Sequence, residues 1–134
     1  MGYSPDFIKA ESANLVEVVG SFRPNGAGAV LDVRGSGFTV SRTGVGIFTV
    51  VLNKPKTQSE YEGTVVTPGF ATGAVIANLG VSAGTYTAPT ATAAATLTIL
   101  AYLVSTGAAS DTYVAGADNR IQFRAVFRTS SLRV

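Results

Sequence analysis

Apolar and polar residues alternate with a period of two along most of this chain, most clearly in residues 120–129. On one side of an extended strand fall Ile121, Phe123, Ala125 and Phe127, and on the other side fall Arg120, Gln122, Arg124 and Arg128. This alternation is typical of a β-strand with one buried and one exposed face, whereas a helix would repeat every three to four residues. Since the same period recurs throughout the chain, it excludes a mainly helical fold.

Two hairpins are expected in the first 52 residues. Residues 14–23 and 29–34 lie on either side of the tripeptide Pro24-Asn25-Gly26, in which proline fixes φ and Asn-Gly accepts positive φ. The second hairpin is expected over residues 38–52, where two alternating stretches are separated by Thr43-Gly44-Val45-Gly46. The two glycines of that turn supply the backbone freedom that a tight reversal needs.

Shorter strands are expected after a polar break at residues 54–60. They cover residues 63–67, 74–79 and 85–88, with Pro68-Gly69, Gly80 and Gly84 as separators. The stretch 92–104 is apolar on both faces, which predicts a central strand. Nine strand candidates at this spacing predict an all-β fold, namely an antiparallel β-sandwich or barrel of about eight or nine strands, formed by residues 14–134 as one domain.

Residues 1–13 show no strand periodicity, and Phe7 and Ile8 are their only sizeable apolar pair. We therefore expect an N-terminal arm outside the core, which reaches onto a neighbouring molecule. A short helix over residues 4–11 is the alternative, because Ser4 can cap it and Pro5 suits its first turn.

The composition of the chain excludes several kinds of catalytic and metal site. The chain of 134 residues contains no histidine and no cysteine, which excludes a Ser-His-Asp or Cys-His nucleophile and a zinc site built on sulfur. A net charge of +2 is too small for a general attraction to nucleic acid or to membranes. The first residues lack the features of a signal peptide, and no apolar run reaches transmembrane length. We expect no enzymatic activity, no cofactor, no nucleic-acid partner and no membrane partner.

Carboxylates offer two weak candidates for a site. Glu60 and Glu62 are close in sequence, but they lie in the polar break beside lysines and are expected to be a solvated loop. Asp111 and Asp118 flank a loop and could hold calcium together with backbone oxygens, although calcium loops normally concentrate three or more acidic ligands. No metal site is therefore expected.

Arg120, Arg124 and Arg128 share the polar side of the last strand, each about 13 Å from the next. Three interpretations are open: the arginines solubilise an edge strand, they pair with carboxylates of a partner subunit, or they contact phosphate. Together with Phe7 and Ile8, they are the expected interface residues.

The segment Arg34-Gly35-Ser36-Gly37-Phe38-Thr39-Val40-Ser41-Arg42-Thr43-Gly44-Val45-Gly46-Ile47-Phe48-Thr49-Val50, preceded by Gly20-Ser21-Phe22-Arg23-Pro24-Asn25-Gly26, resembles small all-β virion proteins of tailed bacteriophages. The similar proteins are of the capsid decoration (cement) or knob type, with a Gly-Phe-x-Val-x-Arg-x-Gly-x-Gly-x-Tyr/Phe-Thr-Val run. The resemblance covers about a third of the chain, with Phe48 at the aromatic position. It implies a homotrimer on the capsid exterior, without catalytic residues.

The resulting expectation is a structural virion protein, made in the host cytoplasm, that decorates or cements a capsid as a homo-oligomer. Its partners would be the major capsid protein or another virion protein, and further copies of itself. The alternative is a receptor- or carbohydrate-binding tip module of a tail fibre or adhesin. Sugar sites usually offer exposed tryptophan or tyrosine, and this chain has no tryptophan and five scattered tyrosines.

Overall fold

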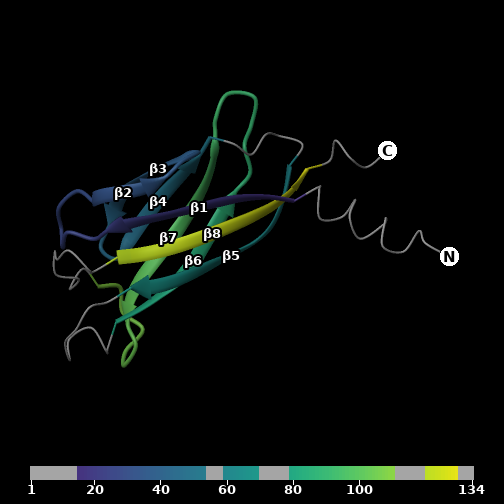
Figure 1. Cartoon of the computed structure of the whole chain (residues 1–134). Coiled ribbons are helices and arrows are strands. Elements are labelled where there is room, and N and C mark those ends of the chain that lie inside the picture. The colour runs from purple at the N-terminus through teal and green to yellow at the C-terminus, as the bar shows by residue number, and fades with distance from the viewer. Residues whose placement is uncertain (1–14, 54–58, 70–78, 111–119, 130–134) are drawn as a thin grey trace.

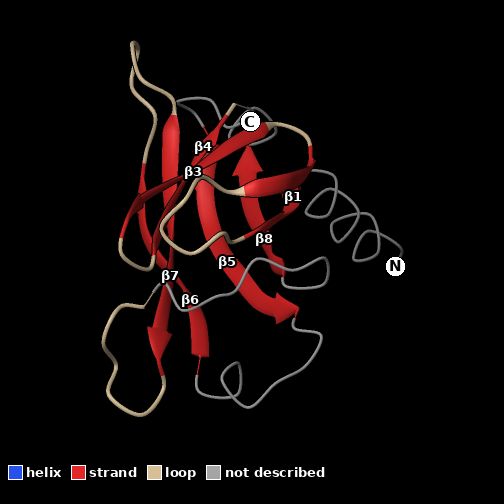
Figure 2. Cartoon of the chain, turned by 90° about the vertical axis from the view of Figure 1, so that its left-hand side faces the viewer, coloured by secondary structure: helices blue, strands red, loops and turns tan. Residues whose placement is uncertain are grey.

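The structure is a computed structural model that describes residues 15–53, 59–69, 79–110 and 120–129. These residues form eight antiparallel strands and no helix (Figures 1 and 2). The strands are β1 (Leu15–Arg23), β2 (Leu31–Gly35), β3 (Phe38–Gly44), β4 (Ile47–Leu52), β5 (Ser59–Gly69), β6 (Leu79–Thr87), β7 (Ala95–Leu103) and β8 (Arg120–Thr129). The expected all-β class is confirmed.

The strands form two four-stranded sheets that pack face to face. The first sheet has the order β2-β1-β8-β5 and the second has the order β3-β4-β7-β6. The sheets do not close into a barrel, so of the two expected architectures the structure is a β-sandwich. Figure 1 shows β8 running between β1 and β5, which makes the last strand of the chain an interior strand of its sheet.

The core lies between the two sheets and follows from the alternation of each strand. In β7 the buried side chains alternate with partly exposed ones, as they do in β4. Aromatic rings join the sheets along the sandwich: Phe22 lies against Phe48 at 5.1 Å between ring centroids, and Phe38 meets Phe123 edge-on at 4.9 Å. Such contacts add about 1 kcal/mol each to the burial of the rings.

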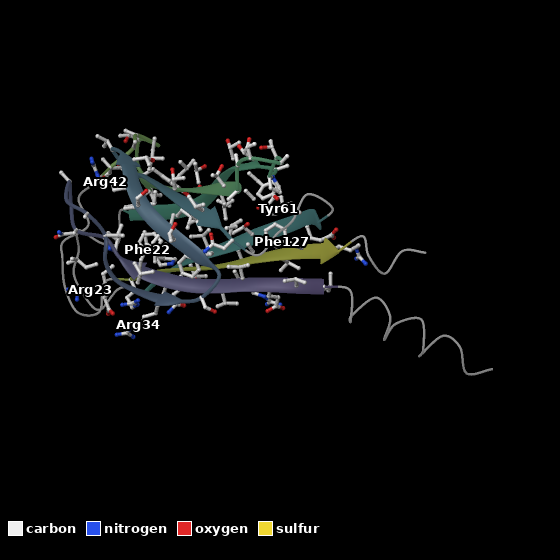
Figure 3. All side chains as sticks on the ribbon, turned by 90° about the horizontal axis from the view of Figure 1, so that it is seen from above. Phe22, Arg23, Arg34, Arg42, Tyr61 and Phe127 are labelled. Carbon is white, nitrogen blue, oxygen red and sulfur yellow. The ribbon has the colours of Figure 1, made fainter. Side chains whose placement is uncertain are left out.

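Two tyrosines close one side of the sandwich, where β5 and β6 are the last strands of their sheets. The rings of Tyr61 and Tyr86 stack at 4.2 Å, and both pack against Phe127. Tyr61 and Phe127 lie next to each other near one end of the sandwich, with Phe22 nearer the other end (Figure 3). Burial, followed by the nearby Tyr61, raises the pKa of Tyr86 above its ordinary value.

Both expected hairpins are confirmed. β1 pairs with β2, with Arg23 opposite Leu31, and β3 pairs with β4, with Phe38 opposite Leu52. Gly46 in the second turn has a φ of +64°, and its carbonyl accepts a hydrogen bond of 2.8 Å from the amide of Ala101 in β7. A Cβ there would lie 2.3 Å from the carbonyl oxygen of Ala101, so the turn requires glycine.

The strands after residue 54 are longer than expected. β5 begins at Ser59, so Glu60 and Glu62 belong to a strand, and the polar break is shorter than the expected 54–60. The strand also continues through Pro68 and Gly69, which sit opposite Ile121 and Arg120 of β8. A proline is tolerated because β5 is an edge strand, whose outer backbone groups need no partner in the ladder.

The expected break at Gly80 and Gly84 is also wrong, because both residues lie inside β6. Gly80 is paired with Tyr102 of β7, whose ring would lie 2.6 Å from a Cβ at that position. The glycine therefore marks a close approach of an aromatic ring rather than a turn. β6 therefore joins Leu79 to the strand expected at residues 85–88, while residues 74–78 of the strand expected at 74–79 lie outside the described residues. β7 is the central strand that was expected over residues 92–104, with the narrower bounds Ala95–Leu103.

Several expectations fall outside the described residues. They are the N-terminal arm over residues 1–13 with Phe7 and Ile8, the alternative helix over 4–11, and the loop that contains Asp111 and Asp118.

Candidate interaction surfaces

Arg120 lies at the start of β8, and only 10% of its side chain is exposed. Its guanidinium reaches across β1 to β2. It donates hydrogen bonds to the hydroxyl of Ser21 at 2.8 Å, to the Asp32 carboxylate at 2.7 Å and to the Asp32 backbone carbonyl at 2.7 Å. One side chain therefore links three adjacent strands of the first sheet, and a bidentate guanidinium is well suited to this geometry.

Asp32 is held in an uncommon conformation at this site. Its φ of +47° lies in the left-handed region, where aspartate is one of the few tolerated side chains. Arg34 donates a second hydrogen bond to the carboxylate at 2.9 Å. The hydrogen bonds from Arg34 and Arg120 lower the pKa of the Asp32 carboxyl below its ordinary value.

The other two arginines of β8 pair with carboxylates on neighbouring strands. Arg124 binds Glu17 of β1, and both side chains are about half exposed. Arg128 lies 3.5 Å from Glu62 of β5. Each of the three expected interface arginines therefore has a carboxylate partner within its own chain. Since β8 is an interior strand, the interpretation that these arginines protect a sheet edge is wrong.

The strand registers define the outer face of the first sheet, which we call the arginine face. Its residues are Leu15, Glu17, Val19, Ser21, Asp32, Arg34, Glu62, Val65, Thr67, Arg120, Gln122, Arg124, Val126 and Arg128. Val19, Arg124 and Val65 form one row across β1, β8 and β5. Val19 and Val65 are 55% and 64% exposed, whereas the apolar residues on the inner faces of the two sheets form the core.

Three shallow depressions adjoin this row. The first, of about 240 Å³, is lined by Val19, Val65, Thr67, Gln122, Phe123 and Arg124. The second, of about 380 Å³, continues from Val19 and Gln122 toward Arg34, and the third, of about 410 Å³, continues from Val65 and Arg124 toward Glu62. Neighbouring depressions share lining residues, so they lie side by side across the arginine face, and we call the three together the furrow.

The outer face of the second sheet is different, and we call it the hydroxyl face. The registers place on it Thr39, Ser41, Thr43, Ile47, Thr49, Val51, Gly80, Ser82, Thr87, Thr96, Thr98, Leu100 and Tyr102. None of these described residues carries a charge. The hydroxyl groups of Thr43 and Thr49 form a hydrogen bond of 2.9 Å with each other, so some hydroxyl groups of this face have a hydrogen-bond partner within it.

Chemistry-bearing clusters are absent from the part of the chain that the structure describes. No three acidic residues come together there in a way that would hold a metal ion. Of the two carboxylates that are close in sequence, Glu62 is paired with Arg128, and the side chain of Glu60 lies outside the described part of the structure. In the same residues no helix is long and apolar enough to cross a membrane.

Sequence reasoning did not identify Asp32, Val19 and Val65 as surface residues of interest. Alternation in β1 places Val19 on the same side as Glu17 and Ser21, so the sequence alone could have predicted an apolar residue on the polar face of this strand. Nothing in the sequence marks Asp32, because its role depends on Arg120, which is 88 positions away.

Phe7 and Ile8, the remaining expected interface residues, lie outside the described residues. Comparison of the chain with protein-family models, with curated proteins and with solved structures finds no match in any of the three.

Proposed function

We propose that this protein is a structural component of a tailed-bacteriophage virion, which decorates or cements the capsid exterior as a homo-oligomer and works by contact rather than by catalysis. The observation that carries the proposal is the hydroxyl face. The hairpin β3–β4, whose sequence bears the resemblance to decoration proteins, supplies two of the four strands of that face. An uncharged face of a sheet can pack on a protein surface without the cost of removing charges from water.

The arginine face supports the same function for a related reason. Most of its charges are paired within the face, as in Arg124–Glu17 and Arg128–Glu62, so a partner that covers them need not supply an equal number of charges. Apolar side chains stand between these pairs, as at Val65. Apolar centres with arginine nearby are typical of protein–protein interfaces.

The test is the composition of purified particles. Virions from the strain that encodes the chain would be separated on a density gradient and analysed by quantitative mass spectrometry. We expect the protein in a copy number of the same order as the major capsid protein, and its release by mild denaturant without loss of the tail. Absence from the particle would refute the proposal, and a low copy number that follows the tail would instead favour a tip module.

The alternative function, a carbohydrate-binding tip, depends on an accessible aromatic ring. Tyr61 and Tyr86 are occupied in the stack between the sheets, and Tyr102 is the tyrosine that lies on the hydroxyl face. Its neighbours Ser82 and Leu100 are paired with each other. A glycan array with the wild-type protein and Tyr102→Ala tests this alternative: binding that disappears in the variant would place the tip module first.

A further inference from the structure

We infer that the furrow of the arginine face receives the N-terminal segment of a second copy of this chain, residues 1–14, with Phe7 and Ile8 against Val19 and Val65. The inference rests on the proposed function, because it names the contact that holds the homo-oligomer together. It follows from where the exposed apolar side chains lie, from the balance of charge on the face and from the length of chain before β1.

Exposed apolar side chains are concentrated on the first sheet. Of the eight large apolar side chains exposed in the described residues, six belong to β1, β2 and β5; the eight are Leu15, Val16, Val19, Leu31, Val33, Val45, Val65 and Val104. Val19 and Val65 are the two that border the furrow on both sides of Arg124. Covering them would remove apolar surface from water, which favours an apolar occupant.

The charges of the arginine face indicate the sign of the charge that its occupant should carry. Asp32 is shared by Arg34 and Arg120, while Glu17 and Glu62 each serve one arginine of β8. In these four ion pairs, four arginines therefore meet three carboxylates. The surplus lies with Arg34, whose side chain is 66% exposed and which lines the end of the furrow. Figure 3 shows Arg34 pointing away from the sandwich.

The N-terminal segment matches both requirements. It contains the adjacent apolar residues Phe7 and Ile8, with Asp6 directly before them and Glu11 three positions after Ile8. Lys9 leaves its side chains with a net charge of −1, opposite to the surplus on the face. Pockets that receive individual side chains of a peptide commonly give peptide recognition its specificity, and flanking carboxylates suit an exposed arginine.

Chain length favours a second copy over the same copy. The segment joins β1 at Leu15, at the end of the first sheet where Leu15 faces Arg128. Phe7 lies eight positions before Leu15, so an extended segment would place Phe7 about 26 Å beyond that end. To lie on its own face it would have to reverse direction within residues 9–14, where only Ser12 and Asn14 are residues that favour turns.

Exchange of this kind determines the type of assembly. Each copy would give its N-terminal segment to the next and receive one on its arginine face, which is a heterologous contact. Heterologous contacts close into rings when the rotation permits, and a ring of three agrees with the homotrimer that the resemblance implies. The hydroxyl face then stays available for the capsid.

The experiment measures mass in solution for four full-length proteins by light scattering coupled to size exclusion. They are the wild type, Phe7→Asp/Ile8→Asp, Val65→Arg and the matched control Val104→Arg. Val65 and Val104 are 64% and 61% exposed, so either substitution introduces the same charge at an equally exposed site. Circular dichroism and thermal melting would verify that all four are folded.

We expect the wild type and Val104→Arg to have a mass near three times 13.7 kDa, and the other two variants to have the mass of one chain. A synthetic peptide of residues 1–14 should bind the Phe7→Asp/Ile8→Asp protein, because its furrow is empty. Adding Val65→Arg to that protein should weaken peptide binding by at least about tenfold, as expected when a central contact of an interface is lost. Adding Val104→Arg should leave it unchanged.

Three results would overturn the inference. An oligomer that survives Phe7→Asp/Ile8→Asp or Val65→Arg would place the contact between copies elsewhere. A monomeric wild type that binds no peptide, while the Phe7→Asp/Ile8→Asp protein does bind it, would show that the segment occupies the furrow of its own chain. Failure of the Phe7→Asp/Ile8→Asp protein to bind the peptide would remove the furrow as a docking site. Each of these results leaves the particle composition to be measured separately, so a virion protein with a different contact between copies is recognisable.

Discussion

Replacing Arg120 with methionine should destabilise the protein far more than the same change at Arg124, although both arginines lie on the outer side of β8. The Arg120 side chain is 10% exposed, and its removal takes one hydrogen bond each from the Ser21 hydroxyl, the Asp32 carbonyl and the Asp32 carboxylate, which keeps its hydrogen bonds from Arg34. Loss of one partner from a fully buried ion pair costs about 3–5 kcal/mol. Because the Asp32 side chain is 37% exposed and keeps Arg34, we expect a smaller loss, of about 2 kcal/mol.

Arg124→Met is the matched control. Arg124 and Glu17 are 56% and 45% exposed, and water replaces the lost contact on both side chains. Exposed pairs of this kind contribute about 0–1 kcal/mol, so we expect a loss below about 0.5 kcal/mol. Methionine keeps much of the aliphatic length of arginine, which limits the effect of lost packing in both variants.

Urea unfolding followed by circular dichroism measures the two free energies. With a slope m of about 2 kcal/mol per M, the midpoint should fall by about 1 M for Arg120→Met and by less than about 0.3 M for Arg124→Met. Hydrogen exchange should show lost protection in β2 before the rest of the sheet, because Arg120 anchors that strand at Asp32. Equal midpoints for the two variants would refute the reasoning that Arg120 holds β2 in place.

A double-mutant cycle and a pH series identify Asp32 as the partner. The cost of Arg120→Met should shrink when Asp32 is already asparagine. The folded-state pKa of Asp32 is lowered, so its carboxylate stabilises the fold above the unfolded pKa of about 3.9, and this contribution is lost as pH falls through the folded pKa. Between about pH 5 and pH 2 the wild type should therefore lose more stability than Asp32→Asn. Parallel curves would contradict this assignment.

Two further pairs of substitutions test the turn and the tyrosine stack. Gly46→Ala should lower the free energy of unfolding by about 2–3 kcal/mol, because Gly46 has a positive φ and a Cβ would meet the backbone of Ala101. The control Gly44→Ala should lower it by less than about 1 kcal/mol. Similar melting temperatures for the two variants would refute the turn geometry. Tyr86→Phe should be neutral or stabilise by up to about 1 kcal/mol, because its buried hydroxyl has no hydrogen-bond partner among the described residues. Tyr61→Phe should cost about 1 kcal/mol, since the Tyr61 hydroxyl bonds to Thr64, and the opposite ranking in urea would contradict the stack as described.

The sequence predicted most of the fold because alternation is a local property. Ile121, Phe123, Ala125 and Phe127 are buried as the period of two requires, and the positive φ values of Gly26 and Gly46 follow from preferences that are equally local. The connection between β1 and β2 is longer than the expected tripeptide, because β2 begins only at Leu31. The wrong boundaries, at Pro68 and Gly80, are positions where a neighbouring strand or ring overrides local preference. The neighbouring strand and the neighbouring ring are both distant in sequence, so neither strand boundary could be predicted from the sequence.

The candidate surfaces depend still more on tertiary structure. Arg120, Arg124 and Arg128 are equivalent in sequence, with the same residue type at a constant spacing on one strand. Only the order β2-β1-β8-β5 places Arg120 beside the bent backbone of Asp32 and leaves Arg124 half exposed between two valines. That these side chains face away from the core follows from the alternation alone, because successive residues of a strand point to opposite faces of the sheet. Which arginine is buried and which lines a furrow was decided by strand order, since burial and pairing depend on the neighbours that the fold provides.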